Sequence, residues 1–351
     1  MTERAMKAAV LHGREDVRIE QVAVPELQPG DVLLRVEAAL TCGTDVKVFR
    51  RGYHARMITP PALFGHEVAG TVAEPGTSGL PRGARVVAAN SAPCGQCEYC
   101  RRGTPSLCDD LLFWNGAYAE LARIPARIVG QNVLTLPDGL SFKEAALTEP
   151  LACVLRGVEA SGIIEGRSVA VIGTGPIGLM FVALARLRGA RVVAVGRRPE
   201  GVQKAVAMGA EAGVVVGKDE DLAERLRRET PGGLGPEVVV EAVGRPETSE
   251  AAVRAVRKGG LVNLFAGCPA GTRIAVDAQR LHYQELTITS TFHHTPQGVR
   301  EALRLIAERR IDAGALVTAE APLERLPEVL GALARGGPGL KTAILPRPSA
   351  G

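Results

Sequence analysis

Short apolar runs alternate with amphipathic segments through the middle of the chain. The runs, each of a length suited to one buried strand, lie at 169–172, 191–195, 213–216, 238–242, 261–266 and 286–290. Between them, apolar residues recur at helical spacing, as at Ile177, Phe181 and Leu184. This alternation predicts a doubly wound, parallel α/β sheet.

The first part of the chain follows a different pattern. Strand-like runs divided by glycine and proline lie at 7–11, 17–22, 32–39, 68–73 and 85–89. Polar segments of irregular pattern separate them, including the stretch that follows Thr41-Cys42-Gly43-Thr44-Asp45. We expect a β-rich domain with long loops, and long loops in compact domains are usually functional.

A glycine motif lies at the junction of the first strand and helix of the α/β region. The sequence Gly173-Thr174-Gly175-Pro176-Ile177-Gly178 fits G-x-G-x-x-G, which is weak evidence alone but stands here between a strand and a helix. Gly173 would allow the tight turn, Gly175 the approach of a pyrophosphate, and Gly178 close packing of helix on strand. The N–H groups of the helix N-terminus would then face the phosphates. The alternative is a glycine-rich turn without a ligand.

The end of the second strand of this unit indicates which dinucleotide binds. NAD-binding units place an acidic residue there to bind the ribose hydroxyls, whereas this chain has Gly196 followed by Arg197 and Arg198. Two guanidinium groups suit a 2′-phosphate, so we predict NADP(H) over NAD(H). The alternative is a pair of solvated surface arginines. Val243, which follows the run at 238–242, is also assigned to the cofactor site.

Length and composition limit the classes of function. A chain of 351 residues suggests two domains, and its 46% hydrophobic and 23% charged content is ordinary for a globular protein. The net charge of +4 and the 3% aromatic content give no case for a nucleic-acid surface. The charged start of the chain is not typical of a signal peptide, and no run suits a membrane span, so we expect a cytoplasmic protein.

Four of the seven cysteines lie within fifteen residues, at Cys94, Cys97, Cys100 and Cys108. In a reducing compartment such clustering favours metal binding over disulfides. The spacing C-x2-C-x2-C-x7-C can close a tetrahedral thiolate shell around Zn²⁺, which predicts a structural zinc site with no open position. The alternatives are an iron–sulfur cluster, whose pattern continues with a shorter gap and Cys-Pro, and four free cysteines.

A second group of ligand-type residues is spread over the chain. We expect Cys42, His66, Glu67 and Glu149 each to lie in a loop that glycine or proline punctuates, next to a strand or a helix. A cysteine, a histidine and a carboxylate are an acceptable set for a catalytic zinc with one open position. Spacing alone leaves the alternative of unrelated histidine and glutamate residues equally open.

Taken together, these motifs resemble the medium-chain zinc alcohol dehydrogenases over nearly the whole chain. The motifs occur in the order of that family: Cys42-Gly43-Thr44-Asp45, Gly65-His66-Glu67-x-x-Gly70, the four-cysteine segment, Glu149-Pro150 and Gly173–Gly178. The Glu-Pro pair stands where the alcohol dehydrogenases have cysteine. The chain therefore looks most like the polyol (sorbitol-type) and threonine dehydrogenase branch.

The resemblance implies a fold, a division into domains and a set of cofactors. It implies a GroES-like β-rich catalytic domain at 1–151, with the zinc lobe at 90–112, that is closed by residues 292–351. A Rossmann cofactor-binding domain at 152–291 would be inserted between these two segments. Two zinc ions per chain and a homo-oligomer, either a dimer or a tetramer, are also implied.

The resemblance further implies the roles of individual residues. Catalytic zinc would bind Cys42 and His66, with Glu67, Glu149 or the two in exchange as the third ligand. Structural zinc would bind the four-cysteine cluster. Thr44 falls where the serine or threonine of the family takes the proton of the substrate hydroxyl.

The proton relay beyond Thr44 departs from the family pattern. The position three residues further on is often histidine in this branch, and here it is Lys47. Lysine can pass a proton, but its ordinary pKa is about 10.4. We therefore place Lys47 in the catalytic set without assigning the route by which the proton leaves.

The sequence as a whole predicts a zinc-dependent oxidoreductase that transfers hydride between NADP(H) and a polyol, sugar alcohol or cyclitol. Polar residues in the loops favour such substrates over a plain alkyl alcohol. An L-threonine or simple secondary-alcohol dehydrogenase is the alternative among enzymes. A non-catalytic NADPH-binding protein is the alternative outside them, although Cys42, Thr44, His66, Glu67 and Glu149 together argue against it.

Overall fold

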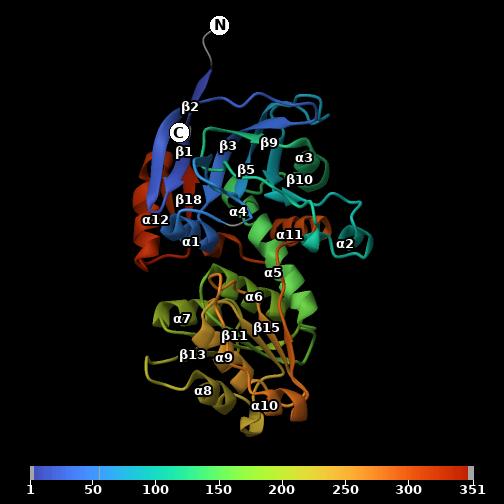
Figure 1. The fold of residues 1–351 in the computed structure, drawn as a ribbon, viewed down its shortest axis with the longest axis vertical. Coiled ribbons are helices and arrows are strands. Elements are labelled where there is room, and N and C mark those ends of the chain that lie inside the picture. Colours follow the sequence, from blue (N-terminus) through green and yellow to red (C-terminus); the bar gives the residue numbers. More distant parts are fainter. Residues whose placement is uncertain (1–3, 55, 347–351) are drawn as a thin grey trace. The chain divides into compact units, whose positions relative to one another are not determined.

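The computed structural model describes residues 4–54 and 56–346 (Figure 1). The chain forms two compact units. Unit 1 comprises the residues up to Pro150 together with those from Thr295 onward, and unit 2 comprises Leu151–His294. Unit 1 is therefore built from both ends of the chain. The domain boundaries that the sequence suggests, after residues 151 and 291, remain a prediction.

Unit 2 is a parallel α/β unit, as the alternation of apolar runs and amphipathic segments predicts. Its strands are hydrogen-bonded in the order β13-β12-β11-β14-β15-β16, and every neighbouring pair is parallel. Helix α6 packs on β11 and β12, and α9 packs on β14 and β15. Covered strands of this kind appear in sequence as nearly continuous apolar runs, which is why they could be predicted. The Rossmann architecture is confirmed.

The elements of unit 2 have the following bounds. The strands are β11 (Ser168–Ile172), β12 (Arg191–Gly196), β13 (Ala212–Val215), β14 (Val238–Glu241), β15 (Leu261–Leu264) and β16 (Thr287–Thr289). The helices are α5 (Thr148–Ala160), which begins in unit 1, α6 (Pro176–Leu187), α7 (Pro199–Ala207), α8 (Leu222–Arg228), α9 (Pro246–Ala255) and α10 (Ala278–Tyr283).

Unit 1 is mainly antiparallel and matches the expected β-rich fold. One sheet has the order β2-β1-β4, and a larger one has the order β10-β6-β5-β3-β18-β17, with β9 also paired to β3. Strands β17 and β18 form a parallel pair within the larger sheet. A further short pair joins β7 to β8.

The elements of unit 1 have the following bounds. The strands are β1 (Ala5–Gly13), β2 (Asp16–Ala23), β3 (Val32–Leu40), β4 (Ala62–Leu63), β5 (Val68–Glu74), β6 (Arg85–Ala88), β7 (Ser91–Ala92), β8 (Leu112–Phe113), β9 (Leu121–Ile124), β10 (Val133–Thr135), β17 (Val317–Pro322) and β18 (Lys341–Leu345). The helices are α1 (Gly43–Arg51), α2 (Glu98–Arg101), α3 (Ala126–Asn132), α4 (Phe142–Ala145), α11 (Pro296–Ala307) and α12 (Leu326–Ala334).

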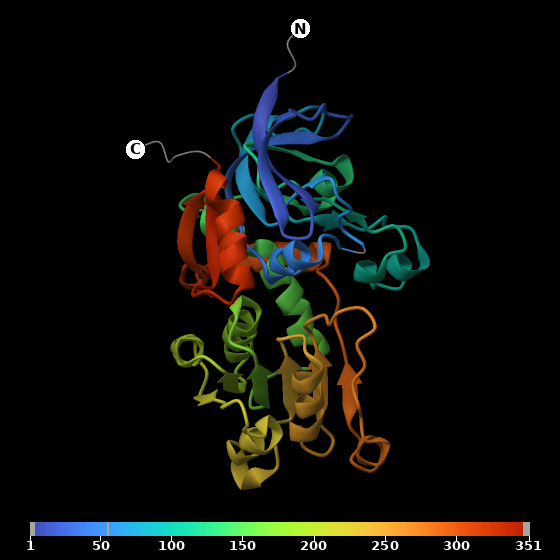
Figure 2. The ribbon, with the colours of Figure 1, turned by 60° about the vertical axis from the view of Figure 1, so that its left-hand side comes forward.

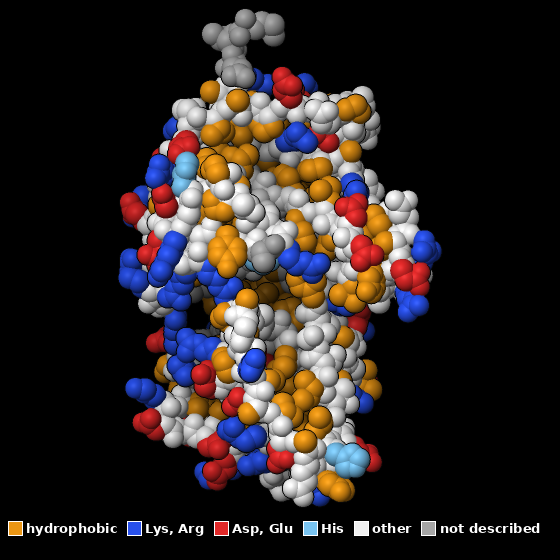
Figure 3. Space-filling model, viewed as in Figure 1, with side chains coloured by type: hydrophobic (Ala, Val, Ile, Leu, Met, Phe, Trp, Pro, Cys, Tyr) orange, Lys and Arg blue, Asp and Glu red, His pale blue; other side chains and the backbone are white. Residues whose placement is uncertain are grey.

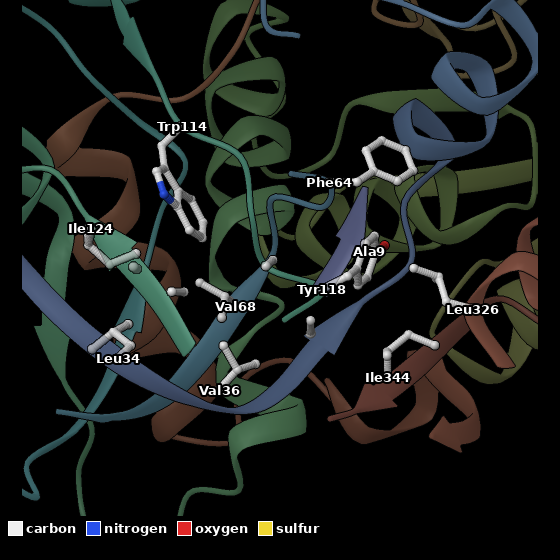
Figure 4. Close-up of a cluster of buried hydrophobic side chains, with 14 of the residues drawn as sticks. Ala9, Leu34, Val36, Phe64, Val68, Trp114, Tyr118, Ile124, Leu326 and Ile344 are labelled. Carbon is white, nitrogen blue, oxygen red and sulfur yellow. The ribbon is translucent and has the colours of Figure 1, made fainter. Parts of the chain in front are cut away.

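Unit 1 has a hydrophobic core to which strands and α12 contribute (Figure 4). Leu34, Phe64, Tyr118 and Ile344 are among its buried side chains. Phe64 and Tyr118 meet edge to face, with ring centroids 5.8 Å apart. The single tryptophan of the chain, Trp114, is 8% exposed in the same cluster. Its fluorescence therefore reports on the packing of unit 1.

The last strand of the chain lies beside one of the first. Strand β18 pairs antiparallel with β3, and Ala343 stands opposite Leu40. Next to this pair, the ammonium group of Lys341 donates to the carbonyl oxygen of Thr41 at 3.1 Å. The end of the chain therefore helps to build the surroundings of Cys42, which follows Thr41.

Two segments differ from the sequence expectation. The polar stretch after Cys42 is helix α1 and not a loop, because local hydrogen bonds cap a segment that contains few apolar residues. Cys42 Sγ accepts from the Thr44 N–H at 3.5 Å, and the Asp45 carboxylate accepts from the Cys42 N–H at 3.0 Å. Glu149 lies in the first turn of α5 and not in a loop, because the first turn of a helix tolerates Pro150.

The surface carries charges of both signs. On the face shown in Figure 3, acidic and basic side chains are interspersed with hydrophobic ones. Within the described residues, no helix combines the length and the hydrophobicity that a membrane span requires.

Candidate metal and cofactor sites

Three ligand-type side chains of unit 1 converge between the end of β3 and the start of β5. Cys42 is the N-cap of α1, and His66 and Glu67 lie just before β5. One ligand atom of each lies within 4.8 Å of the others. His66 and Glu67 are buried, and Cys42 is half-buried. A sulfur, an imidazole nitrogen and a carboxylate oxygen this close together fit the donor set of a zinc ion.

The carboxylate of Asp45 orients His66. Its Oδ1 lies 2.9 Å from His66 Nδ1, and its Oδ2 accepts from the Tyr118 hydroxyl at 2.6 Å. Because a carboxylate only accepts, it holds a proton on Nδ1 and leaves Nε2 to face a metal. Burial disfavours the charged imidazolium, but the charge and the hydrogen bond of Asp45 outweigh burial and raise the pKa of His66.

Tyr118 reaches Asp45 because residue 65 is glycine. Gly65 has a φ of +90°, and a Cβ atom built there would lie 2.5 Å from the Tyr118 ring. Burial and the charge of Asp45 raise the pKa of the Tyr118 hydroxyl, which therefore remains a donor. The glycine of the Gly65-His66-Glu67 motif thus makes room for the tyrosine that holds Asp45.

Glu67 forms a buried ion pair with Lys341. The Lys341 Nζ lies 2.6 Å from both carboxylate oxygens of Glu67. The side chain of Lys341 is 2% exposed and that of Glu67 is 0% exposed. Burial alone would lower the pKa of Lys341, but the charges of Glu67 and Cys42 outweigh burial and raise it. The ammonium group therefore stays charged and compensates the buried carboxylate.

The two predicted candidates for the third zinc ligand have different surroundings. Glu67 belongs to the cluster with Cys42 and His66, but Lys341 binds both of its oxygens. Glu149, which is buried in the first turn of α5, does not join that cluster in the described part of the chain. The third ligand remains a prediction.

The residues predicted to transfer the proton lie on one face of α1. Thr44 and Lys47 are three residues apart in this helix, and both are partly buried. The N–H of Thr44 donates to Cys42 Sγ at 3.5 Å, so the helix start holds Thr44 next to a predicted zinc ligand. The roles of Thr44 and Lys47 remain predictions.

The four-cysteine cluster, Cys94, Cys97, Cys100 and Cys108, lies in a loop that projects from the sheets of unit 1 and includes α2 (Figures 1 and 2). Their sulfur atoms all lie within 4.8 Å of one another. The Sγ atom of Cys97 is 3.5 Å from that of Cys100 and 3.8 Å from that of Cys108. Tetrahedral zinc with bonds of about 2.3 Å requires sulfur atoms about 3.8 Å apart, so these spacings fit a closed zinc shell.

Backbone N–H groups stabilise thiolates in this loop. The N–H groups of Gln96 and Cys97 donate to Cys94 Sγ at 3.4 Å and 3.3 Å and lower the pKa of Cys94. Backbone N–H groups of Cys100 and Asp109 lower the pKa of Cys97 to about 6. Because the thiolate is the form that binds metal, Cys94 and Cys97 are prepared for a cation. Burial has the opposite effect on the other two thiols: it raises the pKa of Cys100 and raises that of Cys108 to about 12.

Replacing Cys97 with serine is expected to lower thermal stability and to leave the turnover of folded molecules intact. Loss of one thiolate opens the shell, so the zinc content should fall by one ion per chain and Tm by at least about 5 °C. Metal analysis and a thermal melt check this, with Cys268→Ser, a cysteine outside the cluster, as the control. Unchanged metal content and Tm in Cys97→Ser would contradict the assignment.

In unit 2 the glycine motif forms the turn between β11 and α6. A Cβ atom built on Gly178 would lie 1.8 Å from the Gly173 carbonyl oxygen, so only glycine fits there. Gly175 is the N-cap of α6 and Pro176 is its first residue. The N–H groups of Ile177 and Gly178, in the first turn of the helix, have no carbonyl partner four residues earlier within the helix. Such a turn fits a bound pyrophosphate.

The other predicted cofactor residues surround this turn. Gly196 ends β12, and the exposed Arg197 and Arg198 follow it. Val243 follows β14, and its Cγ2 atom would lie 3.0 Å from a Cβ atom built on Gly173. The structure therefore brings the predicted residues to the carboxyl ends of neighbouring parallel strands, where dinucleotides bind in such sheets.

Sequence reasoning assigned no role to Asp45, Tyr118 or Lys341. Asp45 could have been found, because its spacing from Cys42 is that of a capping box. Lys341 begins an apolar run, and a buried ammonium group requires an acidic partner. Tyr118 carries no local signal, because its contact with Asp45 depends on how distant segments pack.

Two family models match most of the chain. The model of the alcohol dehydrogenase GroES-like domain matches residues 28–138, and the model of the zinc-binding dehydrogenase matches residues 176–308. The first match lies in unit 1, and the second covers most of unit 2 and continues into α11.

The similarity to known proteins covers nearly the full length of the chain. A sorbitol dehydrogenase of Bombyx mori is 31% identical over 96% of this chain and 97% of its own. An L-threonine 3-dehydrogenase of Pyrococcus abyssi is 32% identical over 89% of both chains. Among solved structures, a protein of Sinorhizobium meliloti 1021 described as a zinc-binding dehydrogenase bound to NADP has a TM-score of 0.87. It is 31% identical, and the match covers 98% of this chain and 100% of the other.

Proposed function

Because the chain belongs to the medium-chain zinc-binding alcohol dehydrogenase family, we propose that this dehydrogenase transfers hydride between NADP(H) and a polyol, sugar alcohol or cyclitol. The observation that carries the proposal is the cluster of Cys42, His66 and Glu67 in unit 1. The glycine turn between β11 and α6 supports it, because it fits a dinucleotide.

The side chains of unit 1 would manage the substrate hydroxyl. Cys42 and His66 would hold zinc, which makes a hydroxyl group more acidic when it is bound. Thr44 would accept the proton and give up its own hydroxyl proton in the same step, and Asp45 would keep His66 in the tautomer whose Nε2 faces the metal. Unit 2 would hold the dinucleotide, whose nicotinamide carries the hydride chemistry.

The similarity to a sorbitol dehydrogenase favours a polyol as substrate. The similarity to an L-threonine 3-dehydrogenase, at 32% identity over 89% of the chain against 31% over 96%, supports L-threonine as the second candidate. Both candidates carry a secondary hydroxyl group next to a second polar group, so they share the same chemistry at the metal.

An oxidation screen with zinc-loaded enzyme tests the substrate class. Sorbitol, xylitol, erythritol, myo-inositol, L-threonine and 2-butanol would each be tested with NADP⁺ and with NAD⁺. We expect kcat/KM to be at least about tenfold higher for one of the polyols or the cyclitol than for the last two compounds, a difference of about 1.4 kcal/mol in transition-state binding. A preference for L-threonine would favour the second candidate, and no turnover of any alcohol would contradict the proposal.

The end of β12 supports NADP(H). Gly196 offers no carboxylate to repel a 2′-phosphate, and the exposed Arg197 and Arg198 follow directly. The similar protein of Sinorhizobium meliloti 1021 was crystallised with NADP. We therefore expect kcat/KM to be higher with NADP⁺ than with NAD⁺.

Replacing both Arg197 and Arg198 with alanine is expected to lower the ratio of kcat/KM for NADP⁺ to that for NAD⁺ by about ten- to a hundredfold, since charge-assisted contacts to a phosphate are lost. Kinetics with both cofactors measure the ratio. Arg191→Ala, an exposed arginine at the other end of β12 that pairs with Glu211, is the matched control and should leave the ratio unchanged. An unchanged ratio in the double variant would identify the two arginines as ordinary surface residues.

A further inference from the structure

Thr174 fills the space beside Gly196. A Cβ atom built on Gly196 would lie 2.5 Å from Thr174 Oγ1, 3.0 Å from Thr174 Cγ2 and 3.1 Å from Val202 Cγ2. Ordinary contacts between carbon atoms are about 3.5–4.0 Å. Gly196 does not have a positive φ, so the neighbouring side chains, and not the backbone conformation, require glycine at this position.

A second glycine is crowded by the same hydroxyl group of Thr174. A Cβ atom built on Gly201, in the first turn of α7, would lie 2.5 Å from the same Oγ1 and 3.2 Å from Thr174 Cβ. Thr174 therefore leaves no room for a Cβ atom at the glycine that ends β12 or at the glycine of α7. A β-branched side chain has few χ1 rotamers, so threonine has little freedom to turn away from either neighbour.

Position 196 is the place where NAD-binding units carry an acidic residue that binds the ribose hydroxyls. We propose that Thr174 is a specificity-determining residue that excludes a carboxylate from position 196 and so keeps the site open to the 2′-phosphate of NADP(H). This inference rests on the NADP(H) preference proposed above. Arg197 and Arg198 would attract the phosphate, and Thr174 would keep out the group that repels it.

A set of variants of the full chain separates the steric effect from the cofactor effect. The set consists of Gly196→Asp, Thr174→Ala, the double variant Thr174→Ala/Gly196→Asp and the matched control Thr174→Val/Gly196→Asp. Alanine removes the two Thr174 atoms that crowd Gly196 and leaves only the contact with Val202 Cγ2, whereas valine keeps the shape of threonine without its hydroxyl. Tm is measured without cofactor, and Kd for NADPH and NADH by the fluorescence of the bound nicotinamide.

The cofactor-free melts test the crowding itself. Gly196→Asp should lower Tm by at least about 5 °C, and Thr174→Ala/Gly196→Asp should recover most of this loss. Thr174→Val/Gly196→Asp should melt as low as Gly196→Asp, because the bulk remains. If Gly196→Asp does not fold, Gly196→Ala, which adds only the Cβ atom, supports the same comparison with Thr174→Ala/Gly196→Ala.

The binding measurements test the effect on specificity. In Thr174→Ala/Gly196→Asp the ratio of Kd for NADH to Kd for NADPH should be at least about tenfold lower than in the wild type. This decrease should exceed the product of the fold-changes that Thr174→Ala and Gly196→Asp cause singly. The proposal would be overturned if Gly196→Asp alone kept the wild-type Tm and shifted the ratio of the two Kd values as far as Thr174→Ala/Gly196→Asp does. A wild-type protein that binds NADH more tightly than NADPH would instead refute the proposed cofactor, and the specificity role with it.

Discussion

Replacing Cys42 with serine is expected to reduce kcat by at least about a thousandfold and to leave NADPH binding unchanged. A metal contributes several kcal/mol to charge stabilisation in such reactions, and each 1.36 kcal/mol is a factor of about ten in rate. Serine lacks the thiolate that binds zinc at neutral pH. In the wild type, the N–H of Thr44 donates to Cys42 Sγ at the start of α1. Serine is also a good N-cap residue, so the start of α1 should remain intact in the variant.

Steady-state kinetics, a titration with NADPH and metal analysis together check this result. Zinc content should fall by one ion per chain, as in Cys97→Ser, which serves as the matched control. The two variants should differ in turnover and in thermal stability, because Cys97→Ser should lose thermal stability and keep turnover. A Cys42→Ser enzyme with the kcat of the wild type would show that the cluster of Cys42, His66 and Glu67 performs no chemistry.

Replacing Lys341 with methionine is expected to destabilise unit 1 by about 3–5 kcal/mol, the usual cost of leaving one member of a buried ion pair uncompensated. Glu67 is 0% exposed, and Lys341 Nζ contacts both of its oxygens at 2.6 Å. Methionine retains the length and the apolar stem of lysine, so the lost charge and hydrogen bonds account for most of the effect.

Urea denaturation of the metal-free protein, followed by the fluorescence of Trp114, measures this loss in the unit that contains the pair. Lys7→Met is the matched control, because the pair of Lys7 and Glu324 is also close, at 2.7 Å, but is 46% and 50% exposed. The urea concentration at the midpoint of unfolding should be nearly the same for Lys7→Met as for the wild type. Glu67→Gln/Lys341→Met should recover part of the stability, since it removes the stranded charge. Equal midpoints for Lys341→Met and Lys7→Met would contradict the role of the buried pair.

Unit 2 could be predicted almost completely from sequence, because its signals are local. Buried parallel strands appear as apolar runs, and the glycine turn between β11 and α6 is a short motif with a strand before it and a helix after it. The order of the strands follows from the fold family. The crowding between Thr174 and Gly196 could not be predicted, because it depends on how the turn packs against the end of β12.

Unit 1 could be predicted only in part, because its site depends on contacts between distant segments. Cys42 and His66 stand in short motifs, and the structure brings one ligand atom of each within 4.8 Å of the other, while their role as zinc ligands stays a prediction. Lys341 and Tyr118 reach the site only through the pairing of β18 with β3 and the packing of the core. The sequence predicts a loop where the structure has helix α1. Hydrogen bonds at the start of this helix, and not a run of apolar residues, define it, and such bonds leave little signal in the hydrophobic pattern.

Whether Cys42 and His66 share one metal ion can be seen in an anomalous difference map at the zinc edge from crystals of the zinc-loaded enzyme. We expect one peak about 2.3 Å from Cys42 Sγ and about 2.0–2.1 Å from His66 Nε2, together with a second peak inside the four-cysteine cluster. A map with the second peak and no density between Cys42 and His66 would contradict a shared ion.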